Sequence, residues 1–144
     1  MRMKHLLILF IGISTLTLTS CSTGASEKVA DEFHLKLDEG DTKYIVDNLA
    51  DTDSGVSEEE WQGFLDLVVS WGPQTERTKK MGFSSKINNG VSTMKLSYSF
   101  QVEEFGLVHE RLVLVDYGKG EGYKIMIAMM NSDEDVVENG TSEY

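Results

Sequence analysis

Apolar residues recur at helical spacing near the start of the chain. Val29, Phe33 and Leu37 lie four residues apart, so a helix would place them along one side. We expect Ser26 to cap this helix, because a serine hydroxyl accepts hydrogen bonds from free backbone amides. Gly40 is expected to end it, because glycine adopts the left-handed backbone that follows many helices. The pattern therefore predicts an amphipathic helix between Ser26 and Gly40.

Two further helices are expected before residue 73. A short one follows Asp41 and Thr42, and its apolar residues are Tyr44, Ile45, Leu49 and Ala50. A longer one starts at Ser57, because Ser57 and Glu60 have the spacing of a capping box, and Gly72-Pro73 ends it. The apolar face of this third helix holds Trp61, Phe64, Leu65, Val68 and Val69.

After Pro73 the apolar positions change to a period of two. Residues 91–102 alternate strictly, which is typical of an antiparallel strand with one buried face. We expect four strands, over residues 75–83, 91–102, 107–117 and 123–130, joined by turns rich in glycine and asparagine. Helices followed by a four-stranded antiparallel meander predict an α+β domain over residues 28–130. Residues 131–144 are acidic and without periodicity, which predicts a disordered tail.

The first twenty residues have the pattern of an export signal. Arg2 and Lys4 precede an apolar run from Leu6 to Leu18. This run is shorter than the roughly 20 residues that a membrane-spanning helix needs. A positive start, a short apolar centre and small residues at the end are typical of a cleaved secretory signal.

The end of this segment resembles the lipobox of bacterial lipoproteins. Leu18-Thr19-Ser20-Cys21 is an aliphatic residue, two small residues and a cysteine. The resemblance implies that Cys21 receives a lipid and becomes the new N-terminus; the alternative is an ordinary signal with Cys21 incidental. Two or more acyl chains hold a protein stably on a membrane. We therefore expect a membrane-anchored lipoprotein of the cell envelope, exposed outside the cytoplasm, with residues 21–27 as a flexible tether.

Charge and cysteine content exclude some classes of partner and site. The formal net charge is −11, which disfavours nucleic acid because phosphate binding needs clustered Lys and Arg. Loss of residues 1–20 removes two cations and no acid, so the mature charge becomes −13. We expect a domain this acidic to stand away from anionic headgroups. One cysteine in the whole chain supplies neither an internal disulfide nor a cysteine-rich metal site.

Three local features resemble domains of the nuclear transport factor 2-like, or cystatin-like, fold. They are the helix ending Leu37-Asp38-Glu39-Gly40-Asp41, the segment Trp71-Gly72-Pro73 followed by Arg77, and a final hairpin with Leu114-Val115 before Gly122-Tyr123-Lys124-Ile125. The resemblance implies that the helices pack on a curved sheet and form a cone with a pocket at its open end. Tyr123 stands where such domains usually carry Trp. The small envelope lipoproteins of this group provide no catalytic motif to match.

Candidate catalytic and metal-binding residues are few. His34 has no carboxylate in obvious sequence register. His109 alternates with Leu107, Arg111 and Val113 along its strand. Neither shows the partner that a general base needs. The acids from Asp51 onward fail the EF-hand pattern, because Gly55 and Gln62 occupy the wrong loop positions. No nucleophile elbow occurs in the sequence. We expect no metal and no cofactor.

Aromatic residues have two interpretations. Trp61, Phe64, Tyr98 and Phe100, together with His109, could line a ligand pocket in the cone. The alternative, which we favour, is that the aromatic residues fill the core. The sequence therefore predicts a non-enzymatic envelope protein that binds an unidentified envelope protein or small ligand. The competing prediction is a small-ligand-binding or enzymatic domain that uses the aromatic pocket.

Overall fold

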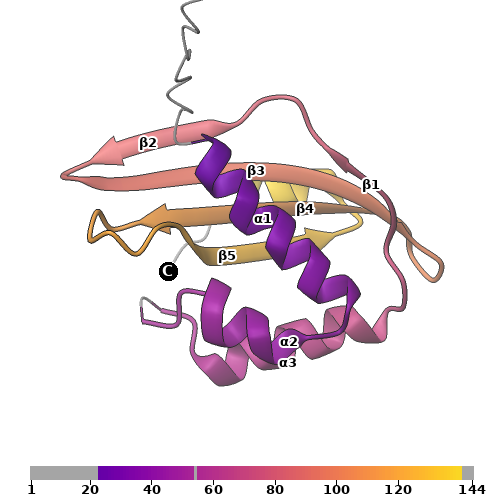
Figure 1. The fold of residues 1–144 in the computed structure, drawn as a ribbon. Helices are drawn as coiled ribbons and strands as arrows, with labels where there is room; N and C mark the ends of the chain where they lie inside the picture. The colour runs from indigo at the N-terminus through magenta and orange to yellow at the C-terminus, as the bar shows by residue number, and fades with distance from the viewer. Residues whose placement is uncertain (1–22, 54, 141–144) are drawn as a thin grey trace, which may run out of the picture.

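The computed structural model describes residues 23–53 and 55–140. The expected signal segment and Cys21 lie outside these residues, as does the end of the predicted tail. The described chain is an α+β domain in which helices come first, an antiparallel sheet follows and one short helix comes last (Figure 1). Within this part of the chain, no helix combines the length and apolar composition that crossing a bilayer requires.

The helical part contains the helical segments that the sequence pattern predicts, with an earlier start of the first. Its elements are α1 (Thr23–Asp38), α2 (Thr42–Tyr44), the π-helical turn η1 (Ile45–Leu49) and α3 (Glu58–Ser70). The capping box is confirmed, because the Ser57 hydroxyl accepts from the Glu60 amide at 3.3 Å and the Glu60 carboxylate accepts from the Ser57 amide at 2.9 Å. Gly40 follows α1 with a φ of 73°, as a glycine that ends a helix does.

The sheet has five strands, one more than expected. They are β1 (Thr75–Lys79), β2 (Ser84–Asn88), β3 (Val91–Val102), β4 (Gly106–Asp116) and β5 (Lys124–Asn131). The order is β1-β3-β4-β5, all neighbours are antiparallel, and β2 also pairs with β3.

The single strand predicted over residues 75–83 is wrong. β1 pairs with the second half of β3, where Lys79 is opposite Tyr98, and β2 pairs with the first half, where Ser84 is opposite Lys95. Twelve residues of β3 are long enough for two short partners in succession. Gly82, with a φ of 94°, lies in the connection between these partners.

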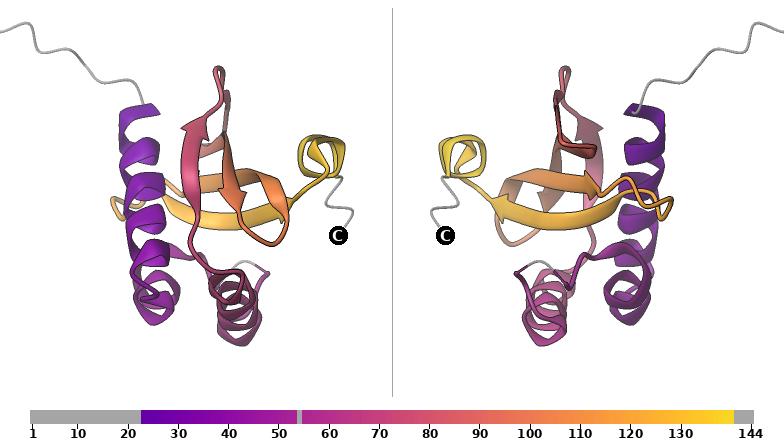
Figure 2. Two further views of the ribbon diagram at one scale, coloured as in Figure 1. Left: turned by 90° about the vertical axis from the view of Figure 1, so that its right-hand side faces the viewer. Right: turned by 90° about the vertical axis from the view of Figure 1, so that its left-hand side faces the viewer.

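The two faces of the sheet are covered by different helices. Figure 2 shows α1 on one face and the short helix α4 (Glu134–Asn139) on the opposite side, with α3 beyond one edge of the sheet. Met94, Leu96 and Tyr98 of β3 face α1 and are buried. Their partners across the ladder, Leu114, Leu112 and Glu110, face the same way.

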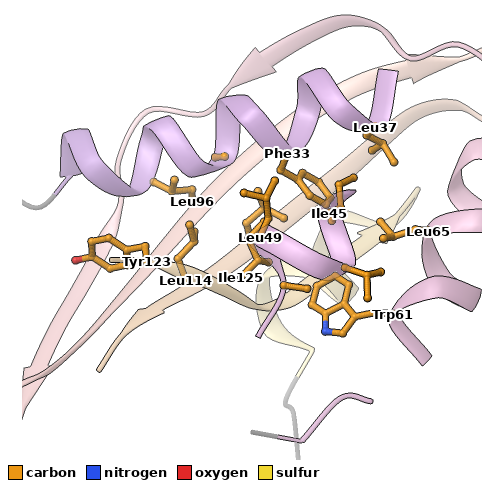
Figure 3. Close-up of a cluster of buried hydrophobic side chains, with 14 of the residues drawn as sticks. Phe33, Leu37, Ile45, Leu49, Trp61, Leu65, Leu96, Leu114, Tyr123 and Ile125 are labelled. Atoms are coloured by element: carbon orange, nitrogen blue, oxygen red, sulfur yellow. The ribbon is translucent and has the colours of Figure 1, made fainter. Parts of the chain in front are cut away.

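Side chains fill the space between the helices and the sheet. Phe33, Ile45, Leu65, Leu112 and Ile125 are fully buried in one cluster, part of which is shown in Figure 3. The favoured interpretation of this region as core is therefore supported by the packing. Two residues of the predicted face of α3 are less buried than expected: Phe64 is half-buried and Val69 is 39% exposed.

Both ends of the domain contain more regular structure than the sequence indicated. α1 begins at Thr23, so the prediction of a flexible tether is wrong for residues 23–27, and Ser26 is buried rather than an exposed cap. The prediction of a disordered tail is wrong for residues 134–139, which form α4. Val137 is fully buried, and this burial supplies the stabilisation that so short a helix lacks on its own.

Candidate functional site

A histidine and a glutamate form a buried pair between α1 and the sheet. Nε2 of His34 lies 2.6 Å from Oε2 of Glu110, although the two residues are 76 positions apart in sequence. His34 follows Phe33 on α1, and Glu110 lies in the middle of β4. Contact between the helix and the concave face of the sheet brings the two side chains together.

The pair is almost completely removed from water. Glu110 is 0% exposed and His34 is 5% exposed. The second carboxyl oxygen, Oε1 of Glu110, is buried and has no hydrogen-bond partner in the described part of the chain. A buried carboxyl oxygen without a partner carries a free-energy cost. This oxygen is therefore a candidate position for contact with a ligand.

Two aromatic rings enclose the imidazole. The ring of Tyr98 meets that of His34 edge-on with centroids 4.6 Å apart, and the ring of Phe33 does so at 5.5 Å. Burial raises the pKa of the Tyr98 hydroxyl well above its ordinary value, and the negative charges of Asp31 and Glu110 act in the same direction. The Tyr98 hydroxyl can donate a hydrogen bond.

An open depression of about 460 Å³ lies beside His34 and Tyr98. Its rim carries both signs of charge, and the cations on it are paired. Arg77 donates to both carboxylate oxygens of Asp38 at 3.0 and 2.9 Å, and Lys79 pairs with Glu27. The depression is bordered by Asp31, His34, Leu35, Asp38, Arg77, Lys79 and Tyr98.

This arrangement contains the elements of acid–base or ligand-binding chemistry. A carboxylate bound at Nε2 fixes the tautomer of an imidazole and leaves Nδ1 to accept a proton or a ligand. Tyr98 adds a hydroxyl donor from the neighbouring strand. No group of three or more metal-ligating side chains that could hold an ion occurs within the described ranges.

Glu110 is the partner of His34 that the sequence pattern did not predict. A signal for it was present, because Glu110 has the same strand parity as Val108, Leu112 and Leu114, which all face the core. A glutamate at a core-facing position of a strand needs a partner. The strand pattern could thus have identified Glu110 as a buried acid. It could not have shown that α1 crosses the sheet so that His34 lies against this residue.

The five residues predicted to line one pocket lie in separate places. Trp61 and Phe64 touch edge-on within α3, Phe100 belongs to a second cluster with Val102 and Val108, and only Tyr98 borders the depression beside His34. The prediction that His109 lines the cone is wrong. Its strand parity is opposite to that of Glu110, so it faces the side of the sheet that α4 covers.

The face under α4 has its own polar contacts. Arg111 donates to the backbone carbonyl oxygens of Glu138 at 2.8 Å and Gly140 at 3.2 Å. Its guanidinium also contacts the sulfur of Met129 at 3.3 Å. These bonds hold the C-terminal helix on the sheet. An open depression of about 440 Å³ lies beside them and is bordered by Lys80, Met81, Gly82, Phe83, Ser84, Lys95, Ser97, Arg111, Glu134 and Glu138.

The helices and the antiparallel sheet together define a nuclear transport factor 2-like fold. A solved structure of a designed protein of this type, Rd1NTF2, is similar to this chain with a TM-score of 0.53. The similarity covers 77% of this chain and 100% of the designed protein, at 17% sequence identity. At this identity the similarity shows the fold alone. No family model and no curated protein matches the sequence.

Proposed function

We propose that this protein is a lipid-anchored protein of the cell envelope, exposed outside the cytoplasm, which acts by binding and not by catalysis. The observation that carries the anchor is Leu18-Thr19-Ser20-Cys21, placed directly after a positive start and a short apolar run. Cys21 is the single cysteine of the chain, and it lies where the lipid would be attached.

The packing of the domain supports binding at its surface. The space between helices and sheet is occupied by large apolar side chains, whereas small-molecule sites are concave, mostly apolar and enclosing. The depression beside His34 is open and its rim is charged. The bound species is an envelope protein or a small ligand that contacts such a surface.

The anchor is tested by substitution of the cysteine. Cys21→Ala is expected to abolish incorporation of labelled fatty acid and to release the protein from the membrane fraction. Ser22→Ala, which keeps the cysteine, is the matched control and is expected to remain labelled and anchored. A Cys21→Ala protein that still takes up the label and stays with the membrane would refute the anchor.

A second function is favoured by one specific observation, the unpartnered Oε1 of Glu110 beside His34 and Tyr98. It is small-ligand binding or acid–base chemistry at the depression on that side of the domain. A fragment screen followed by NMR tests it. Binding is expected to shift the ring resonances of His34 and Tyr98 and to leave those of His109, on the opposite face, unchanged.

A further inference from the structure

One segment of this acidic protein contains cations and no acids. Residues 77–102 hold five Lys and Arg residues and no Asp or Glu, in a chain with 24 acids and a net charge of −11. The segment comprises most of β1, all of β2 and all of β3. Charge is therefore unevenly distributed along the sequence. The five cations are Arg77, Lys79, Lys80, Lys86 and Lys95.

Two of these cations are free to bind an external anion. Arg77, Lys79 and Lys80 form ion pairs with acids of α1 and α4. Lys86 and Lys95 form no ion pair with any described residue. Lys95 is opposite Ser84 in the β2–β3 ladder, and Lys86 is two residues after Ser84 on β2, so both lysines lie on the same face of this hairpin.

Large apolar side chains are exposed on the same segment of the chain, Ile87 on the face of the hairpin opposite to Lys86. Met81 is 100% exposed, Ile87 is 70% exposed and Phe83 is 55% exposed. Every residue of β2 is exposed, and β3 is its one partner in the described sheet. An exposed strand edge with apolar side chains is a liability in a freely diffusing protein. We call residues 81–87 together with Lys95 the β2 surface.

The β2 surface lies at the end of the domain where the anchor would be attached. Figures 1 and 2 both place the β2–β3 hairpin beside the first turns of α1, and Lys79 pairs with Glu27 of α1. α1 begins at Thr23, two residues after Cys21. Two residues of fully extended chain span at most about 7 Å, so an anchor at Cys21 would hold this end of the domain close to the bilayer.

We propose that the β2 surface lies on the membrane that holds the anchor, with Lys86 and Lys95 on anionic phospholipid headgroups and Met81 and Phe83 in the interfacial region. This inference rests on the proposed lipid anchor. Basic residues near a bilayer are attracted to anionic lipid, and apolar side chains among them bury in the interface. Pairing between the β2 edges of two copies is disfavoured, because it would bring the lysines of both copies together.

Net charge alone does not decide how the domain meets the bilayer. A uniform charge of −13 would hold the domain away from anionic headgroups, but attraction at short range depends on the charges that face the surface. The acids surrounding the core lie mostly on the helices and the far loops. Acids do lie near this end of the domain, but they pair with other cations of the segment: Glu27 with Lys79, and Glu134 and Glu138 with Lys80. Lys86 and Lys95 form no ion pair among the described residues, so their charges are available to headgroups.

Depth-dependent fluorescence quenching tests the orientation. The full lipidated protein carries an environment-sensitive label at Met81→Cys or, as a control, at Leu67→Cys, since Leu67 is 56% exposed on α3. Each protein is reconstituted in phosphatidylcholine vesicles with or without phosphatidylglycerol and with brominated lipids as quenchers. We expect loss of emission at position 81, greater when phosphatidylglycerol is present, and little loss at position 67.

A charge-reversed variant tests the role of the lysines. Lys86→Glu/Lys95→Glu is expected to remove the effect of phosphatidylglycerol on quenching at position 81. Lys43→Glu/Lys119→Glu makes the same change of net charge at two other exposed lysines and is expected to keep that effect. An unchanged phosphatidylglycerol effect in Lys86→Glu/Lys95→Glu would overturn the assignment of the lysines to headgroups.

Vesicle flotation separates the two proposals. If the protein floats with vesicles while position 81 is quenched no more than position 67, the orientation is wrong and the anchor stands. If the wild-type protein does not float, the anchor fails and the orientation fails with it. If a soluble envelope extract abolishes the quenching at position 81, a protein partner, and not the bilayer, occupies the β2 surface.

Discussion

At the scale of single residues, the His34–Glu110 pair is the feature that the sequence pattern explains least. Taking two ionisable groups out of water costs free energy that their mutual attraction repays only with good geometry. Here one hydrogen bond of 2.6 Å forms, and one oxygen of Glu110 is left without a partner. The pair is therefore a weak source of stability, and its removal can be tested.

We expect His34→Leu to lower the free energy of unfolding by about 3–5 kcal/mol, because it leaves a buried carboxylate uncompensated. Glu110→Leu leaves the imidazole without its hydrogen-bond partner and is expected to cost less, about 1–3 kcal/mol. Urea unfolding of both proteins and of the double variant measures the effects.

The double variant measures the energetic coupling between His34 and Glu110. Two interacting residues are expected to show a combined cost well below the sum of the single costs. Additive costs would show that the two groups are not coupled. A double variant as stable as the wild type would show that the pair adds no net stability to the fold.

At the scale of elements, the sequence predicted what depends on local contacts. The capping box of α3 was predictable because Ser57 and Glu60 are three residues apart and bond to each other. The strict alternation of β3 predicted its buried face correctly. The division between β1 and β2 was not predictable, because it depends on how much of β3 each strand pairs with.

Turn packing gives a prediction at this scale. Gly118 and Gly120 lie in the turn between β4 and β5 with similar φ values, 73° and 81°. A Cβ at Gly118 would lie 2.7 Å from the carbonyl oxygen of Gly90, whereas nothing lies within 4 Å of a Cβ at Gly120. Both alanine variants incur backbone strain of about 1–2 kcal/mol.

We expect Gly118→Ala to cost a further 1–3 kcal/mol or so, because the methyl group must displace the β2–β3 turn. Thermal and urea unfolding of both variants measure the difference, in which the shared strain cancels. Equal losses of stability would show that the turns do not touch in solution.

At the scale of the whole molecule, the domain has packed side chains on both faces of its sheet. The nuclear transport factor 2-like resemblance predicted the helices on the concave face, and the fold comparison bears this out. The helix on the other face was missed, because residues 134–139 are acidic and only one of their side chains is fully buried. The location of the lipid anchor stays a prediction, since Cys21 lies outside the described residues.

Adjacent valines of α4 test this second layer. Val137 is 0% exposed and Val136 is 45% exposed. Val137→Ala removes buried apolar groups and is expected to cost about 1–2 kcal/mol of unfolding free energy. Val136→Ala is expected to change it by less than about 0.5 kcal/mol. Indistinguishable unfolding midpoints for the two variants would mean that α4 does not pack on the sheet in solution.

The start of α1 at Thr23 has a consequence for how the protein would meet its partners. Because so few residues separate Cys21 from a rigid helix, an anchored domain would stay within a short distance of the bilayer surface. Encounters would then take place by lateral diffusion in two dimensions, where confinement raises the effective concentration of anything in the same layer. Partners dissolved in the surrounding compartment would have to come to that layer to be bound.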